Sequence, residues 1–226
     1  MLSRRRRLRD EAGFTLIELL VTISILTVVM ITLTAMVFEY MRQTNETSTR
    51  INESSDQQFV SAYWQLDVSS IGIHGFAKNA AVPLPEQQSV WSGADVPGCS
   101  APNPVVTLGW NTYPTGSTNV DGAWTGATPN YAVYYTTSSG SQTVLHRKRC
   151  GDANTDITLA RYLAAPPGLP TCLNSAGATV LCSSTNPLPA ALSLKITVQD
   201  KGASVHTATG RSAGYSTILT AERRQG

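Results

Sequence analysis

One carboxylate, Glu18, stands inside an otherwise uncharged apolar run that extends from Phe14 to Phe38. As a helix rising ~1.5 Å per residue, the run reaches ~37 Å, enough to cross a hydrocarbon core of ~30 Å with some tilt. An ionisable side chain in a membrane helix is costly and is usually retained for a partner. We therefore expect Glu18 to form an ion pair; the alternative is a plain anchor whose Glu18 extends to the lipid headgroups.

A block of arginines, Arg4 to Arg7 and Arg9, precedes this run. Because an excess of Lys and Arg marks the cytoplasmic flank of a membrane helix, we expect the block inside the cell and everything after Phe38 outside the membrane. The net charge of the chain is only +2, which gives no obvious face for a polyanion. An orientation signal is therefore favoured over nucleic-acid binding for the arginines.

The junction between the two segments reads Gly-Phe-Thr-Leu-Ile-Glu-Leu over residues 13–19. It resembles the cleavage and methylation motif of type IV prepilins and type II secretion pseudopilins. The resemblance implies that a prepilin peptidase cuts after Gly13 and N-methylates Phe14, so that Glu18 becomes the fifth mature residue. A secretory signal peptide fits less well, because no small-x-small cleavage site follows the apolar core.

The resemblance also implies a role for Glu18 in assembly, where the new N-terminal amine of one subunit meets the glutamate of a neighbour in the filament core. Such a buried pair adds little net stability, because desolvation offsets much of the Coulomb attraction. We expect the pair to set the register between subunits, because an unpaired Glu18 in apolar surroundings is strongly penalised.

The remaining chemistry-bearing residues are four cysteines, all in the part expected outside the membrane, where disulfides persist: Cys99, Cys150, Cys172 and Cys182. Four cysteines allow three pairings, and sequence alone does not select one. We favour Cys172–Cys182, because Asn174 and Gly177 can turn the intervening segment back on itself. We favour Cys99–Cys150 as the second pair, because it would tether a long loop to the end of a predicted strand. A zinc site is disfavoured, because no two cysteines stand two to four residues apart.

The elements that position these residues begin with one long helix. Proline is absent between Phe14 and Val82, so helical order can continue to about Ile71, where Gly72 and Gly75 supply a stop. Within its last part, an apolar stripe at helical spacing is expected to pack on a sheet. The stripe consists of Phe59, Ala62, Tyr63, Leu66 and Ile71.

Strands follow the helix. The segment from Ala77 to Asn130 reads as an irregular region with one strand, 105–110, and with tryptophans expected to pack over the sheet rather than bind sugar. Hairpins are predicted for 131–137 with 142–150 and for 192–199 with 204–209, a weaker strand for 157–163, and a closing strand for 215–221. The predicted fold class is α+β: a long N-terminal transmembrane and amphipathic helix followed by a mostly antiparallel sheet of about four to six strands.

Three further segments resemble the PilW-type minor pilins and the J-type pseudopilins: 65–72 at the helix end, the hairpin 131–135 into 145–147, and the end of the last strand at 222–224. The expected organisation is a basic leader over 1–13, a transmembrane and assembly half-helix over 14–38, an extracytoplasmic half-helix over 39–71 and a globular β-rich domain over 72–226. The resemblance implies the type IV pilin fold.

Signatures of catalysis and metal binding are weak. The chain contains no Gly-x-x-x-x-Gly-Lys-Ser/Thr, Gly-x-Ser-x-Gly or His-Glu-x-x-His motif, and its three histidines are scattered singly. Residues 152–156 copy the first half of a calcium loop, but Ile157 replaces the expected glycine and Leu163 the final glutamate, so an Asx turn is favoured. We expect no enzyme activity, no cofactor and no metal.

The function predicted from the resemblance is that of a minor pilin or pseudopilin. Its partners would be prepilin peptidase, other pilins through the N-terminal helix, and the inner (cytoplasmic) membrane, with final location at the pilus or cell surface. One alternative is a DNA-uptake pseudopilus subunit, for which Arg147, Lys148 and Arg149 are the only basic cluster after the leader. Another is a membrane-anchored adhesin that keeps its leader and binds through the tryptophan-rich loop.

Overall fold

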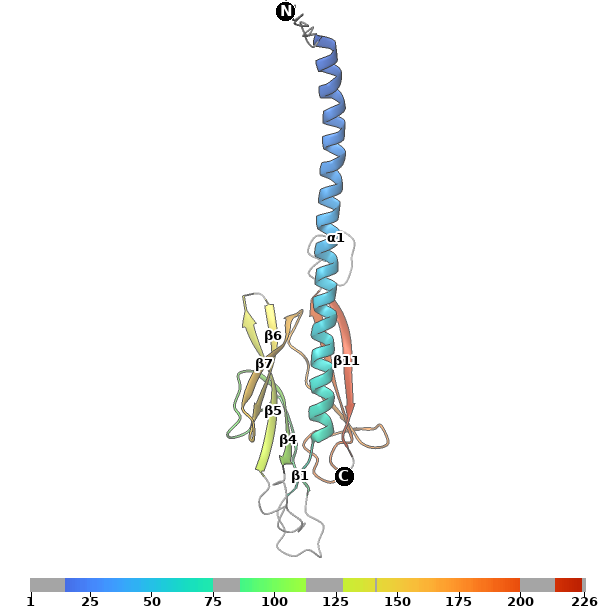
Figure 1. Ribbon diagram of the computed structural model, residues 1–226. Coiled ribbons are helices and arrows are strands. Elements are labelled where there is room, and N and C mark those ends of the chain that lie inside the picture. Colours follow the sequence, from blue (N-terminus) through green and yellow to red (C-terminus); the bar gives the residue numbers. More distant parts are fainter. Residues whose placement is uncertain (1–14, 75–85, 113–127, 141, 200–213, 225–226) are drawn as a thin grey trace, which may run out of the picture. The chain divides into compact units, whose positions relative to one another are not determined.

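The structure is a computed structural model that describes residues 15–74, 86–112, 128–140, 142–199 and 214–224. One long helix precedes a series of strands, so the α+β class and the antiparallel sheet expected from the sequence are confirmed (Figure 1). The chain forms two compact units, Met1–Ser48 and Thr49–Gly226. Gly13 and Phe14, which flank the expected cut, lie outside the described residues. So does Gly75, which was expected to help stop the helix.

Helix α1 spans Leu16–Ser70. Thr15 precedes it, and the Thr15 hydroxyl accepts a hydrogen bond from the backbone N–H of Glu18 at 3.4 Å, which is the contact of an N-cap. The helix ends where expected: the Ile71 N–H donates to the Val68 carbonyl, and Gly72 then takes a φ of 150°. Gly72 also makes a parallel bridge to Trp110, so the chain enters the sheet region directly from the helix.

The strands form two sheets within the described ranges. Their bounds are β1 Ile73–His74, β2 Glu86–Gln87, β3 Val90–Ser92, β4 Pro104–Thr112, β5 Thr128–Ser139, β6 Gln142–Cys150, β7 Thr155–Leu163, β8 Thr171–Leu173, β9 Thr179–Val180, β10 Ala191–Gln199 and β11 Gly214–Glu222. A two-stranded sheet pairs β1 with β2, and a nine-stranded sheet has the order β3-β4-β5-β6-β7-β10-β8-β9 with β11 on β10. The sheet is larger than predicted, because segments read as loops contribute the short strands β3, β8 and β9.

One predicted hairpin is confirmed and the partner of the other is corrected. Strands β5 and β6 pair from Tyr131↔Cys150 to Ser139↔Gln142, with Gly140 at φ 63° in the turn. Strand β10, by contrast, pairs with β11 over its whole length, and the predicted partner 204–209 lies outside the described residues. The pairing with β11 sets Leu194 opposite Leu219, so that buried side chains from both strands share one face.

The second unit has its core between α1 and the large sheet. Helix residues Val60, Trp64, Val68 and Ile71 are buried against the inward side chains of the strands. Trp64 meets Tyr134 edge-on at a centroid distance of 5.3 Å. These residues are spaced i, i+4, i+8 and i+11, which places them on one face of a helix.

The predicted helix stripe is therefore wrong in most of its members. Phe59 and Leu66 are 51% and 58% exposed, and Ala62 is exposed too. Of that stripe only Ile71 is buried, and Tyr63 packs against the core while half-buried. The sequence carries two apolar stripes on this part of α1, and the stripe that contains Trp64 meets the sheet.

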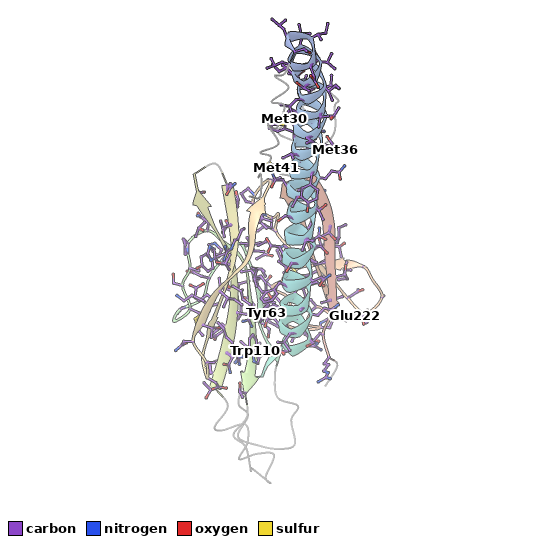
Figure 2. All side chains as sticks on the ribbon, turned by 45° about the horizontal axis from the view of Figure 1, so that its top comes forward. Met30, Met36, Met41, Tyr63, Trp110 and Glu222 are labelled. Atoms are coloured by element: carbon purple, nitrogen blue, oxygen red, sulfur yellow. A yellow bond between two sulfur atoms is a disulfide. The ribbon has the colours of Figure 1, made fainter. Side chains whose placement is uncertain are left out.

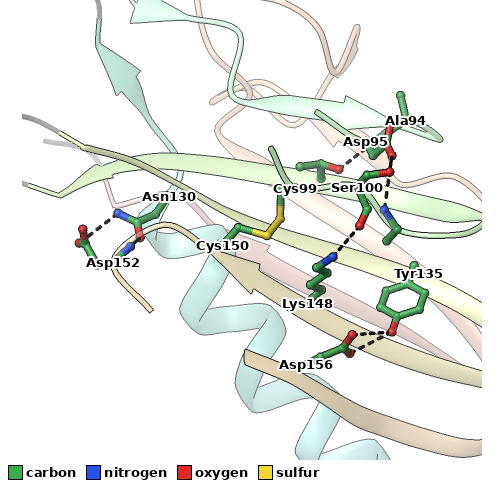
Figure 3. The surroundings of a disulfide bond; sticks show 12 residues. Ala94, Asp95, Cys99, Ser100, Asn130, Tyr135, Lys148, Cys150, Asp152 and Asp156 are labelled. Atoms are coloured by element: carbon green, nitrogen blue, oxygen red, sulfur yellow. Dashed lines mark hydrogen bonds between the residues drawn. A yellow bond between two sulfur atoms is a disulfide. The ribbon is translucent and has the colours of Figure 1, made fainter. Parts of the chain in front are cut away.

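A smaller cluster lies on the opposite face of the sheet. Strand side chains Val133 and Tyr135 are covered there by the loop between β3 and β4, whose Val96 and Cys99 are buried. The Cys99–Cys150 disulfide, with a Cα–Cα distance of 5.7 Å, joins this loop to the end of β6 (Figure 3). The bond holds the loop on the outer face of the sheet, as the figure shows.

Candidate functional site

The first unit presents an uncovered apolar helix. Residues Leu16–Asn45 are long and apolar enough to cross a membrane, with a mean hydropathy of 2.5, and none of that window is buried. The methionines labelled in Figure 2, Met30, Met36 and Met41, project from this stretch and are 56–72% exposed. Such a surface is unfavourable in water and favourable in lipid or against other apolar helices.

Three residues are expected to direct processing and assembly: Gly13, Phe14 and Glu18. Gly13 and Phe14 lie outside the described residues, and Glu18 occupies the first helical turn. The Thr15–Glu18 spacing is that of a capping box, in which the threonine satisfies an unpaired N–H at the start of the helix. A carboxylate near a helix N-terminus is also favoured by the helix dipole. Glu18 therefore lies at the N-terminal end of the described helix, in its first turn.

Comparison with known protein families finds a match at the N-terminus. Residues 8–34 match the family model described as "Prokaryotic N-terminal methylation motif". The N-terminus is a prepilin-type methylation motif. It indicates a type IV pilin-like prepilin that is processed by a peptidase and assembles with other pilins. No curated protein and no solved structure matches the chain.

In the second unit, a buried charged group joins the helix to the sheet. Asp67 on α1 and Arg147 on β6 are 1% and 4% exposed. The guanidinium donates from Nε to Asp67 Oδ2 and from a terminal nitrogen to Oδ1, both at 2.6 Å, and the Tyr134 hydroxyl donates to Oδ2 at 2.7 Å. Tyr63 places its ring 4.9 Å from the guanidinium carbon. We call Asp67, Arg147 and Tyr134 the buried triad.

The protonation of the buried triad follows from its contacts. Burial alone would lower the pKa of Arg147, but the hydrogen bonds and the negative charge of Asp67 raise it overall. Burial and the charge of Asp67 raise the pKa of Tyr134 well above its ordinary value. The guanidinium thus stays charged and the phenol stays neutral, which is the state in which both donate to the carboxylate. The group is suited to fixing the helix on the sheet, because all three of its residues are buried.

The basic cluster weighed for DNA binding is divided by the sheet. Arg147 is buried in the triad, and Arg149 lies with its guanidinium carbon 5.4 Å from the ring of Trp110. Lys148 points to the other face, where its Nζ donates to the Ser100 carbonyl at 2.8 Å (Figure 3). Because successive side chains of a strand alternate between faces, the three residues form no common basic surface.

The two acidic ends of the calcium-like segment also separate. Asp152 bonds to Asn130, whose amide donates to its carboxylate and whose carbonyl accepts from its backbone N–H. Asp156 accepts from the Tyr135 hydroxyl at 2.9 Å (Figure 3). Among the described residues, no group of three His, Cys, Asp or Glu side chains is placed to hold a metal ion.

The remaining predicted residues have the following places. A second disulfide joins Cys172 to Cys182, and between them Asn174 Oδ1 accepts from the N–H groups of Ala176 and Ala178. Trp91 meets Tyr131 edge-on at 5.9 Å, and Trp124 lies outside the described residues.

Sequence reasoning missed the partnership of Asp67 with Arg147. The only sequence signal for this pair was Asp67 itself, an aspartate among the apolar residues near the end of the predicted helix.

Proposed function

We propose that this chain is a minor pilin or pseudopilin, a structural subunit that is cut between Gly13 and Phe14, methylated at Phe14 and then assembled into a pilus or pseudopilus. One observation carries the proposal: a prokaryotic N-terminal methylation motif leads directly into an apolar helix that no described part of the chain covers. Such a helix requires lipid before assembly and other apolar helices after it. Likeness to the PilW-type and J-type proteins supports a minor rather than a major subunit.

The proposed route begins in the cytoplasmic membrane, with the arginine-rich leader inside and the disulfide-bonded domain outside. Prepilin peptidase removes residues 1–13. Glu18 then pairs with the N-terminal amine of a neighbouring subunit, which selects the register at which the helices associate. The extracytoplasmic domain packs against sibling pilins, and its two disulfides suit an oxidising compartment.

The test is the intact mass of protein recovered from membranes and from sheared filaments of the native host. The expected species starts at Phe14 and carries one methyl group. A Gly13→Val variant is expected to remain in the membrane as uncut precursor, with Gly168→Val as a matched control that is cut normally. A mature protein that retains Met1, or one cut at another position, contradicts the proposal.

A further inference from the structure

The large sheet ends in one long edge strand, β11. Among its described strands, β3, β9 and β11 each pair with a single neighbour and so stand at an edge. Strands β3 and β9 have three and two residues, whereas β11 has nine. At ~3.4 Å per residue, β11 is ~30 Å long. Half of its backbone N–H and C=O groups, those on the side away from β10, have no partner strand among the described residues.

Strand β11 lacks the features by which proteins usually protect a sheet edge. Those features are proline, lysine, inward-pointing charges, a β-bulge or a very short strand. The sequence of β11 reads Gly-Tyr-Ser-Thr-Ile-Leu-Thr-Ala-Glu, in which the only charge is the last residue, Glu222. Its register with β10 continues through nine consecutive pairs without a bulge, and Ile218 is 65% exposed. The edge is therefore open to pairing with a further strand.

Strand β11 runs beside the second-unit part of helix α1 (Figure 1), and a groove of about 610 Å³ lies between them. The strand lines the groove with residues 217–220. The helix lines it with small or amide side chains that carry no charge: Gln57, Gln58, Ser61, Ala62 and Gln65. Because glutamine amides both donate and accept hydrogen bonds, this wall suits backbone groups and hydroxyl side chains. A strand added to β11 would lie ~4.8 Å from it, with alternate side chains directed towards the helix.

We propose that β11 binds an extended, uncharged segment of another polypeptide, which adds a further strand to the large sheet. The free backbone groups of β11 supply the affinity, since main-chain hydrogen bonds do so wherever a peptide joins a sheet edge. The groove supplies the selectivity. Its lining residues offer no counter-ion, so a partner with apolar or hydroxyl side chains is favoured over a charged one.

This binding site goes beyond the proposed function and does not depend on it, because all of its residues lie in the second unit. A mature protein that retains Met1 would contradict the proposed function and leave the binding site unaffected. Failure of the peptide to bind, by contrast, would leave the processing and assembly route intact.

The probe is a fluorescently labelled nine-residue peptide of alternating threonine and valine, with an N-methyl group on every second residue. These methyl groups leave one hydrogen-bonding edge free, so the peptide can extend a sheet but cannot form one of its own. Binding to the full-length chain in detergent is measured by fluorescence anisotropy, and a dissociation constant below about 1 mM is expected. The control peptide, N-methylated on every residue, is expected not to bind. Equal binding of the two peptides, or no binding of the probe, overturns the proposal.

Hydrogen exchange followed by mass spectrometry locates the bound probe. Exchange is expected to slow over residues 214–222 and to stay unchanged over the other two edges, 90–92 and 179–180. Protection confined to any other segment overturns the proposal. Protection of 214–222 that rises with protein concentration and that the probe does not displace assigns the edge to a second copy of this chain, which also overturns it.

The variant Ala62→Trp tests the groove. Ala62 lines the groove and is exposed, so a large ring can fill the space beside β11 without entering the core. Affinity for the probe is expected to fall about tenfold or more, while the unfolding temperature stays unchanged. The control Leu66→Trp adds the same ring on the same helix, at a position that is 58% exposed and does not line the groove, and it is expected to bind normally. Equal affinity of the two variants overturns the groove as the binding site.

Discussion

Asp67 and Arg147 are 80 residues apart in the chain and form a two-point ion pair with both N–O distances at 2.6 Å. The pair lies inside the core, with the Tyr134 hydroxyl as a third contact. A buried pair of this kind contributes little net stability compared with apolar residues of similar size, but the removal of one partner leaves a charge without compensation. Its clearest use here is to fix how the helix sits on the sheet.

The first prediction concerns this pair. Arg147→Met is expected to reduce the free energy of unfolding by roughly 3–5 kcal/mol, because Asp67 then lies in the core without its charged partner. Urea denaturation of the full-length protein in detergent, followed by tryptophan fluorescence, measures the loss. The double variant Asp67→Leu with Arg147→Met is expected to recover much of it. Equal losses in the single and double variants would contradict the ion-pair explanation.

The second prediction concerns alkaline pH. Burial and the hydrogen bond to Asp156 raise the pKa of Tyr135 to about 12. The ordinary tyrosine pKa is about 10, so the folded state favours the neutral phenol. The stabilisation is complete below about pH 10 and is lost as the pH rises from about 10 to 12. In urea titrations at several pH values, Tyr135→Phe is expected to flatten this part of the profile, whereas a control Tyr40→Phe in the exposed helix leaves it unchanged.

The third prediction concerns the disulfides. In the chain-entropy view, loss of Cys99–Cys150 costs about 4 kcal/mol and loss of Cys172–Cys182 roughly 3 kcal/mol, because the first bond closes the longer loop. Non-reducing peptide mapping is expected to yield these two pairs. The serine double variants are then compared by denaturation. A Cys150–Cys172 peptide would exclude the pairing, and four alkylatable thiols would exclude the oxidising compartment.

The fourth prediction concerns Glu18. Glu18→Ala is expected to insert and to be cut normally, since the loss of a charge makes the helix less costly to place in a membrane. Assembly is expected to fall, because the partner of a neighbour's N-terminal amine is missing. Fractionation into membranes and filaments measures the effect, with Glu39→Ala as the control on the same helix. Equal incorporation of Glu18→Ala and the wild-type chain would refute the register role.

The fifth prediction concerns Gly109 on β4. A Cβ atom there would lie 2.7 Å from Ile73 Cδ1, 3.0 Å from a ring carbon of Trp91 and 3.2 Å from one of Tyr131. Gly109→Ala is therefore expected to lower the free energy of unfolding by about 1–3 kcal/mol through overpacking. At Gly168 nothing lies within 4 Å, so Gly168→Ala serves as the matched control. Similar melting temperatures of the two variants would contradict the prediction and show that the side chains around Gly109 shift at little energetic cost.

The sequence by itself determined the features that depend on neighbouring residues. The methylation motif is recognised within residues 8–34 of the sequence, and apolar composition alone defines a helix able to span a membrane. The hairpin of β5 and β6 was likewise predictable, because a short glycine-containing turn joins strands that are adjacent in the chain. Each of these follows from chemistry within a few tens of residues.

Only the tertiary structure decided which face of the helix is covered. Periodicity over 59–71 permits two apolar stripes, and local propensity does not distinguish them. The choice depends on strand residues far along the chain: Tyr134 packs on Trp64, and Arg147 takes the carboxylate of Asp67. The pairing of β10 with β11 depends in the same way on residues separated by a long connection. Because burial and ion pairing form between distant segments, the exposure of Phe59 and Leu66 becomes evident only after the sheet is built.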